Sequence, residues 1–351
     1  MLLISKLLNN LILIGQISDV ILDDLVKWEI EEKQLFFPLS IDVKYLRNRL
    51  KERGDLLLSL FPDINKLSLS SHPHFLVNLW RLWLPLSLEL MAKNKRLNRP
   101  IIQGILGGQG TGKTTLGQVL QFILAKANYS LISLSLDDLY KTYLERQELQ
   151  IADPRLIWRG PPGTHDIELG INVLDSLRDL PNNPQAIAIP RFDKSLWNGA
   201  GDRVSPEMVT EADIVLFEGW FVGVKPIAPC KFSDAPYPII TERDRQFALD
   251  MNEKLGEYLP LWQRLDQLII LDPVDYQLSK KWRQQAEHEM IAKGKSGMTD
   301  AEINQFVEYF WKALHPELFI KPLIEKGENV NLVIEINGDH SLGKIYDPWD
   351  S

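Results

Sequence analysis

Apolar residues recur at helical spacing through the first 96 residues of the chain. Two groups each fall on one face of a predicted helix: Ile21, Leu22, Leu25 and Trp28 in one, and Leu76, Leu79, Trp80 and Trp83 in the other. Pro62 and Pro73 separate the helical pieces. Because no chemistry-bearing motif lies here, we predict that residues 1–96 form a helical extension packed on a catalytic domain, in preference to an independent binding module.

After Arg99 and Pro100 the pattern changes to short apolar runs bounded by glycine that alternate with amphipathic segments. Six runs are predicted strands, at residues 101–106, 130–136, 186–189, 214–217, 268–271 and 330–336. After the first run, one helical face carries Leu116, Val119, Leu120, Ile123 and Leu124. This alternation predicts an α/β domain with a mostly parallel sheet over residues 97–351.

Composition narrows the possible partners. The chain has 351 residues and is 45% hydrophobic, which is ample for one large α/β domain and a smaller helical region. Its 39 basic and 47 acidic residues give a formal net charge of −8, which argues against bulk binding to nucleic acid or anionic membranes. The single cysteine, Cys230, excludes an internal disulfide framework, and we expect it to be a small buried hydrophobe.

The first 15 residues are apolar, but Lys6, Asn9 and Asn10 interrupt them and no small-residue cleavage pattern follows. We therefore expect no export signal. No uninterrupted apolar stretch reaches the roughly 20 residues that cross a bilayer. A soluble, cytoplasmic protein is expected.

The strongest motif is a complete glycine-rich phosphate-binding sequence between the first predicted strand and the next helix. It consists of Gly107, Gly108, Gln109, Gly110, Thr111, Gly112, Lys113, Thr114 and Thr115, and it satisfies G-x-x-x-x-G-K-[ST] in full. Glycines let the backbone wrap around phosphates, so that N–H groups and the positive helix end point at oxygen atoms. We expect Lys113 to reach the β- and γ-phosphates of ATP and the Thr114 hydroxyl to ligate Mg²⁺.

Acidic residues follow two of the predicted strands, at the sheet edge where ligands of open α/β sheets collect. Asp137 would orient or deprotonate a substrate hydroxyl as a general base. Asp138 beside it is equally well explained as the cap of the helix that begins there. Glu218 ends the run 214–217 and suits a role in holding Mg²⁺ or its water shell, the alternative being a chance surface glutamate.

Turn-rich segments at residues 159–166 and 190–195, with the later Arg203, supply cations for a small anionic substrate. The candidate substrate-binding residues are Tyr140, Arg159, His165, Asp166, Arg191, Lys194 and Arg203. Arginine can hold a carboxylate with a bidentate fork. Taken singly, each cation is equally compatible with an ordinary surface ion pair.

A basic helical segment at residues 280–285 follows the run 268–271. A solvated basic face is its simplest explanation. The alternative is a lid over residues 274–298 that closes on ATP, brings Arg283 to the transferring phosphoryl group and excludes water.

These features together resemble the phosphoribulokinase, uridine kinase and pantothenate kinase group of P-loop kinases, and most closely the D-glycerate 3-kinase family. Besides the phosphate-binding loop, the resemblance rests on LSLDDLY at 134–140, RGPPGTHD at 159–166, PRFDKS at 190–195, LFEGWFVG at 216–223 and KWRQQAE at 281–287. It covers roughly residues 100–345.

The resemblance implies the three-layer fold of P-loop NTPases and ATP- and Mg²⁺-dependent phosphorylation of D-glycerate to 3-phosphoglycerate. It assigns Asp137 as the base, and Lys113 and Arg283 as the cations that stabilise the phosphoryl group. Leu139 stands where relatives often carry phenylalanine, and Pro161 and Pro162 lie in the His-Asp loop, so the shape of the acceptor pocket is open.

Two alternatives remain. A uridine or pantothenate kinase would use the same phosphate-binding loop, and a nucleoside acceptor would need an aromatic stacking pocket that no sequence motif reveals. A P-loop ATPase or nucleotide-binding regulator would need no small-molecule acceptor, and would leave Asp137 and the loop of His165 and Asp166 without a use.

Overall fold

A six-stranded sheet forms the centre of the computed structural model, which describes residues 2–31, 42–67, 74–292, 294 and 297–349. Its strands are β1 (Ile101–Gly107), β2 (Leu131–Ser135), β5 (Ile214–Gly219), β6 (Gln267–Pro273), β7 (Val330–Ile336) and β8 (Leu342–Tyr346). They are ordered β2-β5-β1-β6-β7-β8; all neighbours are parallel except β8, which pairs antiparallel with β7. The predicted α/β fold with a mostly parallel sheet is confirmed.

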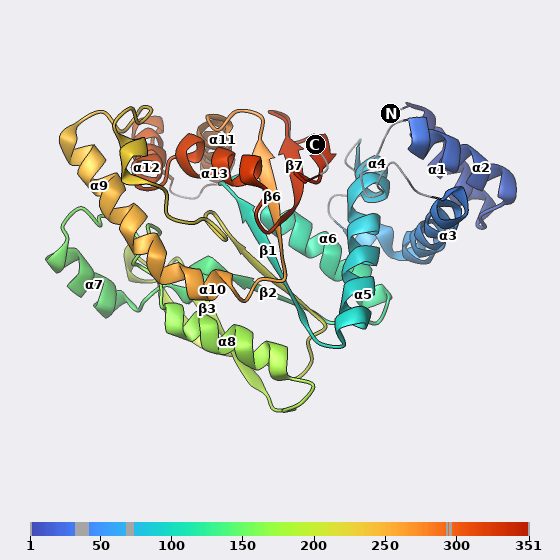
Figure 1. The fold of residues 1–351 in the computed structure, drawn as a ribbon, viewed down its shortest axis with the longest axis horizontal. Coiled ribbons are helices and arrows are strands. Elements are labelled where there is room, and N and C mark those ends of the chain that lie inside the picture. Colours follow the sequence, from blue (N-terminus) through green and yellow to red (C-terminus); the bar gives the residue numbers. More distant parts are fainter. Residues whose placement is uncertain (1, 32–41, 68–73, 293, 295–296, 350–351) are drawn as a thin grey trace.

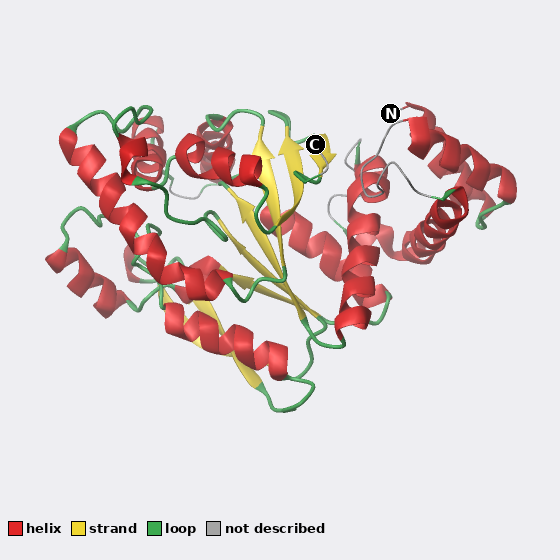
Figure 2. Ribbon diagram, viewed as in Figure 1, coloured by secondary structure: helices red, strands yellow, loops and turns green. Residues whose placement is uncertain are grey.

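Helices lie on both sides of this sheet (Figure 2). The N-terminal elements are α1 (Leu2–Ile14), α2 (Asp19–Glu31), α3 (Val43–Leu60), the 3₁₀ helix η1 (Phe61–Lys66), α4 (Phe75–Asn78), the π-helical turn η3 (Leu79–Trp83) and α5 (Leu84–Leu97). The elements from β1 to β5 are α6 (Lys113–Lys126), η4 (Leu136–Leu139), α7 (Tyr143–Ala152), α8 (Ile167–Asp179), β3 (Ile187–Asp193), η5 (Trp197–Gly199) and β4 (Asp202–Val209). The remaining ones are η6 (Pro229–Phe232), α9 (Glu242–Lys254), η7 (Leu255–Tyr258), α10 (Leu259–Trp262), α11 (Leu278–Ala292), α12 (Asp300–Ala313) and α13 (Pro316–Lys326).

The central strands are buried on both faces, which explains why they read as continuous apolar runs. In β5, Ile214 and Leu216 pack into one apolar cluster with α6, whereas Val215 and Phe217 pack into a second cluster with α8. Successive side chains of a strand point to opposite faces of the sheet, so the two pairs of residues lie on opposite faces. The predicted face of α6, from Leu116 to Leu124, is buried in the first cluster. In β1 and β5 a charged side chain occurs only at the strand end, as Glu218 does.

The N-terminal helices join this first cluster. Apolar residues of α1, α2, α3 and α5 are continuous with those of α6 and of β1 and β5. Figure 1 shows α4 and α5 between the sheet and helices α1 to α3. The periodic residues Ile21, Leu22, Leu25 and Trp28 are buried in α2, as the helical spacing predicted, while Pro73 lies outside the described residues.

One segment in this region meets the length and composition of a membrane-spanning helix, contrary to the expectation that none would. The helical run Phe75–Leu97 has a mean hydropathy of 1.2 in its most apolar window, and 61% of that window is buried inside the protein. The sequence prediction overlooked it because polar residues interrupt the run. Its apolar residues pack against the other N-terminal helices and the sheet layer.

Three further features differ from the sequence prediction. The run 186–189 belongs to β3, which pairs with β4 in a separate two-stranded antiparallel sheet. Strands β4 and β8 were not predicted, since most residues of β4 are exposed and its polar sequence shows no apolar alternation. Cys230 is exposed, because in the short helix η6 it is Phe232 that turns into the core.

A buried ion pair lies inside the N-terminal helices. Arg53 Nη1 of α3 donates to Glu29 Oε1 of α2 at 2.9 Å, and the two side chains are only 2% and 5% exposed. The Arg53 guanidinium also lies 5.0 Å from the Trp80 ring centre. A buried charge without its partner is strongly destabilising, so this pair ties α2 to α3.

We therefore expect Glu29→Met to lower the free energy of unfolding by about 3–5 kcal/mol, because the substitution keeps the side-chain volume but leaves the Arg53 charge buried. Urea unfolding followed by circular dichroism measures the change. The control is Glu31→Met on the same helix, whose partner Lys27 is 75% exposed; it should cost less than about 1 kcal/mol. Equal losses in both variants would contradict the role of the pair.

Candidate active site

The phosphate-binding loop lies between β1 and α6, as the motif predicted. Gly110 and Gly112 adopt φ angles of 79° and 91°, a left-handed backbone that favours glycine. Lys113 Nζ donates to the carbonyl oxygens of Gly107 (2.8 Å) and Gly108 (3.0 Å). Burial lowers the pKa of Lys113 although the charges of Glu218 and Asp137 oppose that effect. The ammonium is thus held by weak carbonyl partners that phosphate oxygens can replace.

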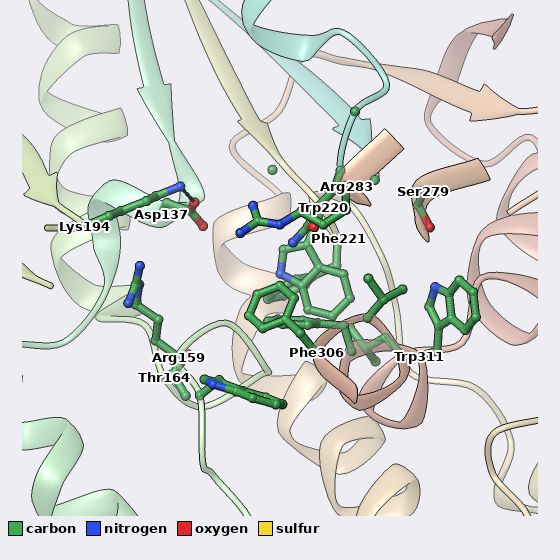
Figure 3. Close-up of a pocket in the computed structure, with 18 of the residues that line it drawn as sticks. Asp137, Arg159, Thr164, Lys194, Trp220, Phe221, Ser279, Arg283, Phe306 and Trp311 are labelled. Carbon is green, nitrogen blue, oxygen red and sulfur yellow. Dashed lines mark hydrogen bonds and ion pairs between the residues drawn. The ribbon is translucent and has the colours of Figure 1, made fainter. Parts of the chain in front are cut away.

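A cavity of about 1680 Å³ opens beside this loop and gathers residues from distant parts of the chain. The predicted site residues that line it are Gly108, Gln109, Gly110, Lys113, Thr114, Asp137, Tyr140, Arg159, Lys194, Glu218 and Arg283. Its wall beyond these residues is rich in aromatic side chains, including Trp158, Trp220, Phe306, Phe310 and Trp311. Figure 3 shows Asp137 and Lys194 on one side and Arg283 pointing into the cavity toward them.

Asp137 carries an ionised carboxylate at the end of β2. Lys194 Nζ donates to its Oδ2 at 2.5 Å, and the Tyr140 hydroxyl donates to its Oδ1 at 2.8 Å. Burial raises the pKa of Asp137, but the charge and hydrogen bond of Lys194 and the hydrogen bond of Tyr140 outweigh it, and the pKa lies below its ordinary value. The carboxylate is therefore charged and available as a hydrogen-bond acceptor.

Asp138 has a structural role. Its Oδ2 accepts from the backbone N–H of Ser135 at 3.0 Å, which completes a capping box around η4. Its Oδ1 accepts from the backbone N–H of Phe192 at 3.3 Å. Arg191, a predicted substrate residue, donates to Asp138 Oδ2 (3.1 Å) and Glu207 Oε2 (2.6 Å) and does not line the cavity. The capping explanation of Asp138 is the one that holds, and Arg191 ties β3 to η4.

His165 lies beneath the site instead of on its wall. The ring is 2% exposed and stacks on Tyr140 with centroids 4.7 Å apart. Its Nδ1 lies 2.7 Å from the Tyr258 hydroxyl, which accepts from the backbone N–H of Gly163 at 2.9 Å. Burial lowers the pKa of His165 to about 3, so the ring is neutral and supports Tyr140 through packing.

Asp166 and Arg203 also lie outside the cavity lining. Asp166 Oδ1 caps α8 by accepting from the backbone N–H of Leu169 at 2.9 Å, and its Oδ2 accepts from Arg203 Nη2 at 2.9 Å. Arg203 Nε donates to the carbonyl oxygen of Tyr140 at 2.8 Å. These residues hold the loop of Tyr140 against α8, while the substrate contacts predicted for them have no support in their geometry.

Glu218 ends β5 beside the phosphate-binding loop, where a second oxygen donor, the Thr114 hydroxyl, lines the same cavity. Glu218 Oε2 is 4.0 Å from Lys113 Nζ. Burial raises the pKa of Glu218, and the charge of Asp137 adds to this, while Lys113 opposes it. One hydroxyl and one carboxylate are the hard oxygen donors that suit Mg²⁺, which otherwise keeps water and phosphate ligands.

Helix α11 covers the phosphate-binding loop. A Cβ added to Gly110 would lie 2.6 Å from the Trp282 Cβ, so the two residues are in close contact. The Trp282 indole donates to the carbonyl oxygen of Gly338 at 3.1 Å and stacks on His340 with centroids 4.6 Å apart. The next residue, Arg283, forms an ion pair with Glu287 and lies over the Phe306 ring at 5.4 Å.

Three residues of this region were missed from the sequence. Asp272 lies near the carboxyl end of β6 as Glu218 lies near that of β5, and the same signal could have found it. Burial, followed by the charge of Glu335, raises the pKa of Asp272 to about 6. Arg146 of α7 lines the cavity and Tyr258 bonds His165, but neither belongs to a recognisable motif. Only the folded chain brings them to the site.

A phosphate-binding loop on a parallel sheet, with an ionised aspartate and a cluster of cations across one cavity, defines a P-loop kinase.

No family model matches the chain. It is 35% identical to the uncharacterized kinase mug58 of Schizosaccharomyces pombe over 232 residues, which cover 64% of this chain and 83% of that protein. It is 30% identical to the chloroplastic D-glycerate 3-kinase of Arabidopsis thaliana over 257 residues, covering 70% of this chain and 54% of that protein.

The structure of D-glycerate 3-kinase from Cryptococcus neoformans superposes with a TM-score of 0.68 at 27% identity, covering 75% of this chain and 98% of that one. The chain belongs to the family of P-loop kinases that includes D-glycerate 3-kinase. It is an ATP-dependent small-molecule kinase, which decides between the kinase and the ATPase alternatives and confirms the predicted resemblance.

The ionisation of Asp137 depends on Lys194, and this can be tested directly. Lys194→Met removes the charge and hydrogen bond that lower the pKa of Asp137 but leaves the burial that raises it. The carboxyl of the variant is expected to take up its proton at a higher pH than in the parent. Titration of the carboxyl ¹³C resonances, with Asp137 assigned through Asp137→Asn, measures the shift. The exposed Lys326→Met is the control, and an unchanged pKa in Lys194→Met would refute the dependence.

Proposed function

We propose that this kinase transfers the γ-phosphoryl group of ATP to the 3-hydroxyl of D-glycerate and releases 3-phosphoglycerate. The observation that carries the proposal is the ionised Asp137 beside the phosphate-binding loop, with Lys194 and Arg159 on the same cavity wall. One side chain accepts a hydroxyl hydrogen bond, and two others offer positive charge to a carboxylate. Two relatives that bear the name D-glycerate 3-kinase support this acceptor.

The residues of the loop would hold the triphosphate of ATP. Lys113 exchanges its bonds to the Gly107 and Gly108 carbonyl oxygens for the β- and γ-phosphates. Thr114 and Glu218 are the proposed protein ligands or water-shell contacts of Mg²⁺. The metal would neutralise charge that develops on the phosphate oxygens during transfer.

The acceptor would lie between Asp137 and the cations of the cavity. Lys194 exchanges part of its interaction with Asp137 for the carboxylate of glycerate, and Arg159 binds the other side of that group. Tyr140, packed on His165, keeps the Asp137 carboxylate in a fixed rotamer. Arg191, Asp166 and Arg203 act through the loops that they hold.

Asp137 would first orient the hydroxyl by accepting its hydrogen bond. A carboxylate with a low pKa is a weak base, so it takes the proton late, as the oxygen–phosphorus bond forms and the bond to ADP breaks. This order suits the loose transition state of phosphoryl transfer, in which positioning and charge stabilisation outweigh early proton removal. Arg283 would leave Glu287 and contribute positive charge at the transferring group.

We propose residues 97–351 as the kinase domain and residues 274–298 as its lid, of which 293, 295 and 296 lie outside the described part of the chain. Support for the lid comes from the contact of Trp282 with Gly110 and from Arg283 in the cavity. The cytoplasm is the proposed compartment, although the printed name of the Arabidopsis relative places that protein in the chloroplast. A fluorescent fusion would test the compartment.

A larger acceptor is the second candidate. Trp158, Trp220, Phe306 and Phe310 line the cavity and offer the flat apolar surface on which the base of a nucleoside acceptor such as uridine would stack. The substrate test therefore has to include both kinds of acceptor.

Purified protein assayed with ATP against D-glycerate, uridine, pantothenate and ribulose 5-phosphate is expected to phosphorylate D-glycerate with the highest kcat/KM. Phosphorus NMR of the product should show a 3-phosphate monoester. Clear turnover of another acceptor without turnover of glycerate would reject the proposed substrate and keep the kinase.

Asp137→Asn should lower kcat about 10²- to 10⁴-fold, because the amide keeps the size of the side chain but cannot take the proton. The KM for ATP should stay within about threefold, since the side-chain hydrogen bonds of Asp137 go to Tyr140 and Lys194 and not to the phosphate-binding loop. The exposed Asp179→Asn on α8 is the control. Activity of Asp137→Asn within a few-fold of the parent, at unchanged ATP binding, would remove Asp137 from the proton transfer.

A further inference from the structure

Two arginines face the cavity without a carboxylate partner among the described residues. Arg146 lies in α7 and Arg159 in the segment that follows it, and both line the cavity. Most other arginines of the chain with a described contact are paired with acids, as Arg203 is with Asp166 and Arg155 with Asp153. Two unpaired guanidinium groups on one cavity wall are an excess of positive charge.

Both arginines bind the same short loop between β3 and β4. Arg159 Nη1 donates to the carbonyl oxygens of Gly199 (2.7 Å) and Ala200 (3.0 Å), and Arg146 Nη2 donates to that of Gly201 (2.5 Å). The two guanidinium carbons lie 5.5 and 5.1 Å from the centre of the Phe192 ring. Three consecutive carbonyls and one aromatic ring thus hold two like charges close together.

The electrostatic surroundings leave this pair undercompensated. Burial lowers the pKa of Arg146, and the positive charge of Arg159 lowers it further. Asp202 opposes this effect, but its carboxylate already accepts from the backbone N–H groups of Tyr143 and Arg203 and from the indole of Trp197. It forms no ion pair with either arginine. Hydrogen bonds to neutral carbonyls offset only part of the electrostatic repulsion between two guanidinium groups.

Arg146 also has an unused donor. Its Nη1 is shielded from solvent and has no hydrogen-bond partner among the described residues. A buried donor without an acceptor destabilises the folded protein. If Arg146 served only to fix the loop, this destabilisation would remain, whereas an anion that draws the guanidinium toward the cavity would give Nη1 an acceptor.

We infer that Arg146 and Arg159 form a two-arginine clamp for the anionic group of the acceptor, and that Arg146 selects anionic over neutral acceptors. The inference rests on the proposed function and extends it to a residue outside every sequence motif of the chain. The clamp binds the end of the acceptor away from the hydroxyl that Asp137 orients.

The loop links the clamp to the reacting hydroxyl. Gly199, Ala200 and Gly201 follow closely after Lys194, whose ammonium is bound to Asp137. An anion held between the arginines lies beside the loop that carries Lys194. The same anion therefore attracts Lys194 away from Asp137, which leaves the carboxylate free to accept the hydroxyl proton.

The test compares Arg146→Gln and Arg146→Lys with the parent, using D-glycerate and its neutral amide, D-glyceramide, as acceptors. Loss of a charge-assisted hydrogen bond of about 1.5–3 kcal/mol corresponds to a roughly 10- to 100-fold higher KM. Arg146→Gln should show this increase for D-glycerate but at most about a threefold change for D-glyceramide. Arg146→Lys should fall between, because it keeps the charge and loses the fork.

Glu148→Gln is the matched control, since Glu148 is exposed on the same helix and outside the cavity. It should leave both acceptors and the KM for ATP near the parent values. Equal effects of Arg146→Gln on the charged and the neutral acceptor, or no effect on either, would reduce Arg146 to a support of the loop and overturn the clamp.

Binding separates the clamp from the choice of acceptor. Isothermal titration calorimetry with D-glycerate and with D-lactate, both monoanions, measures anion affinity in the parent and in Arg146→Gln without turnover. Weaker binding of both anions to the variant, in a protein that does not phosphorylate glycerate, would keep the clamp and reject the glycerate function. Equal binding to parent and variant would overturn the clamp whichever acceptor is turned over.

Discussion

The parallel strands β1 and β5 are buried on both faces, and this burial controls where chemistry can take place in the molecule. A charged side chain within such a strand would be buried without water, so charged residues occur only where the strands end. Because β1, β5 and the neighbouring β2 are parallel, their carboxyl ends lie along one edge. The phosphate-binding loop and Asp137 come at the ends of β1 and β2, and Glu218 lies near the end of β5. Three segments that are far apart in the sequence therefore meet at this edge.

The charges at this edge limit one another. Burial lowers the pKa of Lys113 and raises that of Glu218, and the charge of each of these two groups opposes the shift of the other. The charge and hydrogen bond of Lys194 lower the pKa of Asp137. Lys194 keeps Asp137 ionised in a buried position, and Glu218 lies 4.0 Å from the lysine of the phosphate-binding loop. ATP and an anionic acceptor enter as additional charges, and they replace contacts that the protein now makes with itself. The charged side chains of the site can therefore exchange their contacts within the protein for contacts with ATP and the acceptor.

Around this centre, most of the predicted anion-binding residues serve to hold loops. Asp166 and Arg203 fix the segment of Tyr140, Arg191 ties β3 to η4, and His165 packs as a neutral ring under Tyr140. Positive charge in a loop does not distinguish a ligand contact from an internal ion pair, because both use the same fork of donors. Arg146 and Arg159 line the cavity and form no ion pair with an acid among the described residues, whereas Arg283 lines it and is paired with Glu287.

Features that depend on neighbours along the chain could be predicted from the sequence alone. The phosphate-binding loop, the six apolar runs, the buried face of α6 and the acids at two strand ends are local patterns, since glycine content and side-chain period act over a few residues. The tertiary structure decided what depends on partners far along the chain. It separated β3 from the main sheet, exposed Cys230, paired Arg203 with Asp166 and left Arg146 without an acid. A charged residue is paired within the protein or free to bind a ligand according to which distant group packs against it. The spacing of residues along the chain does not predict that contact.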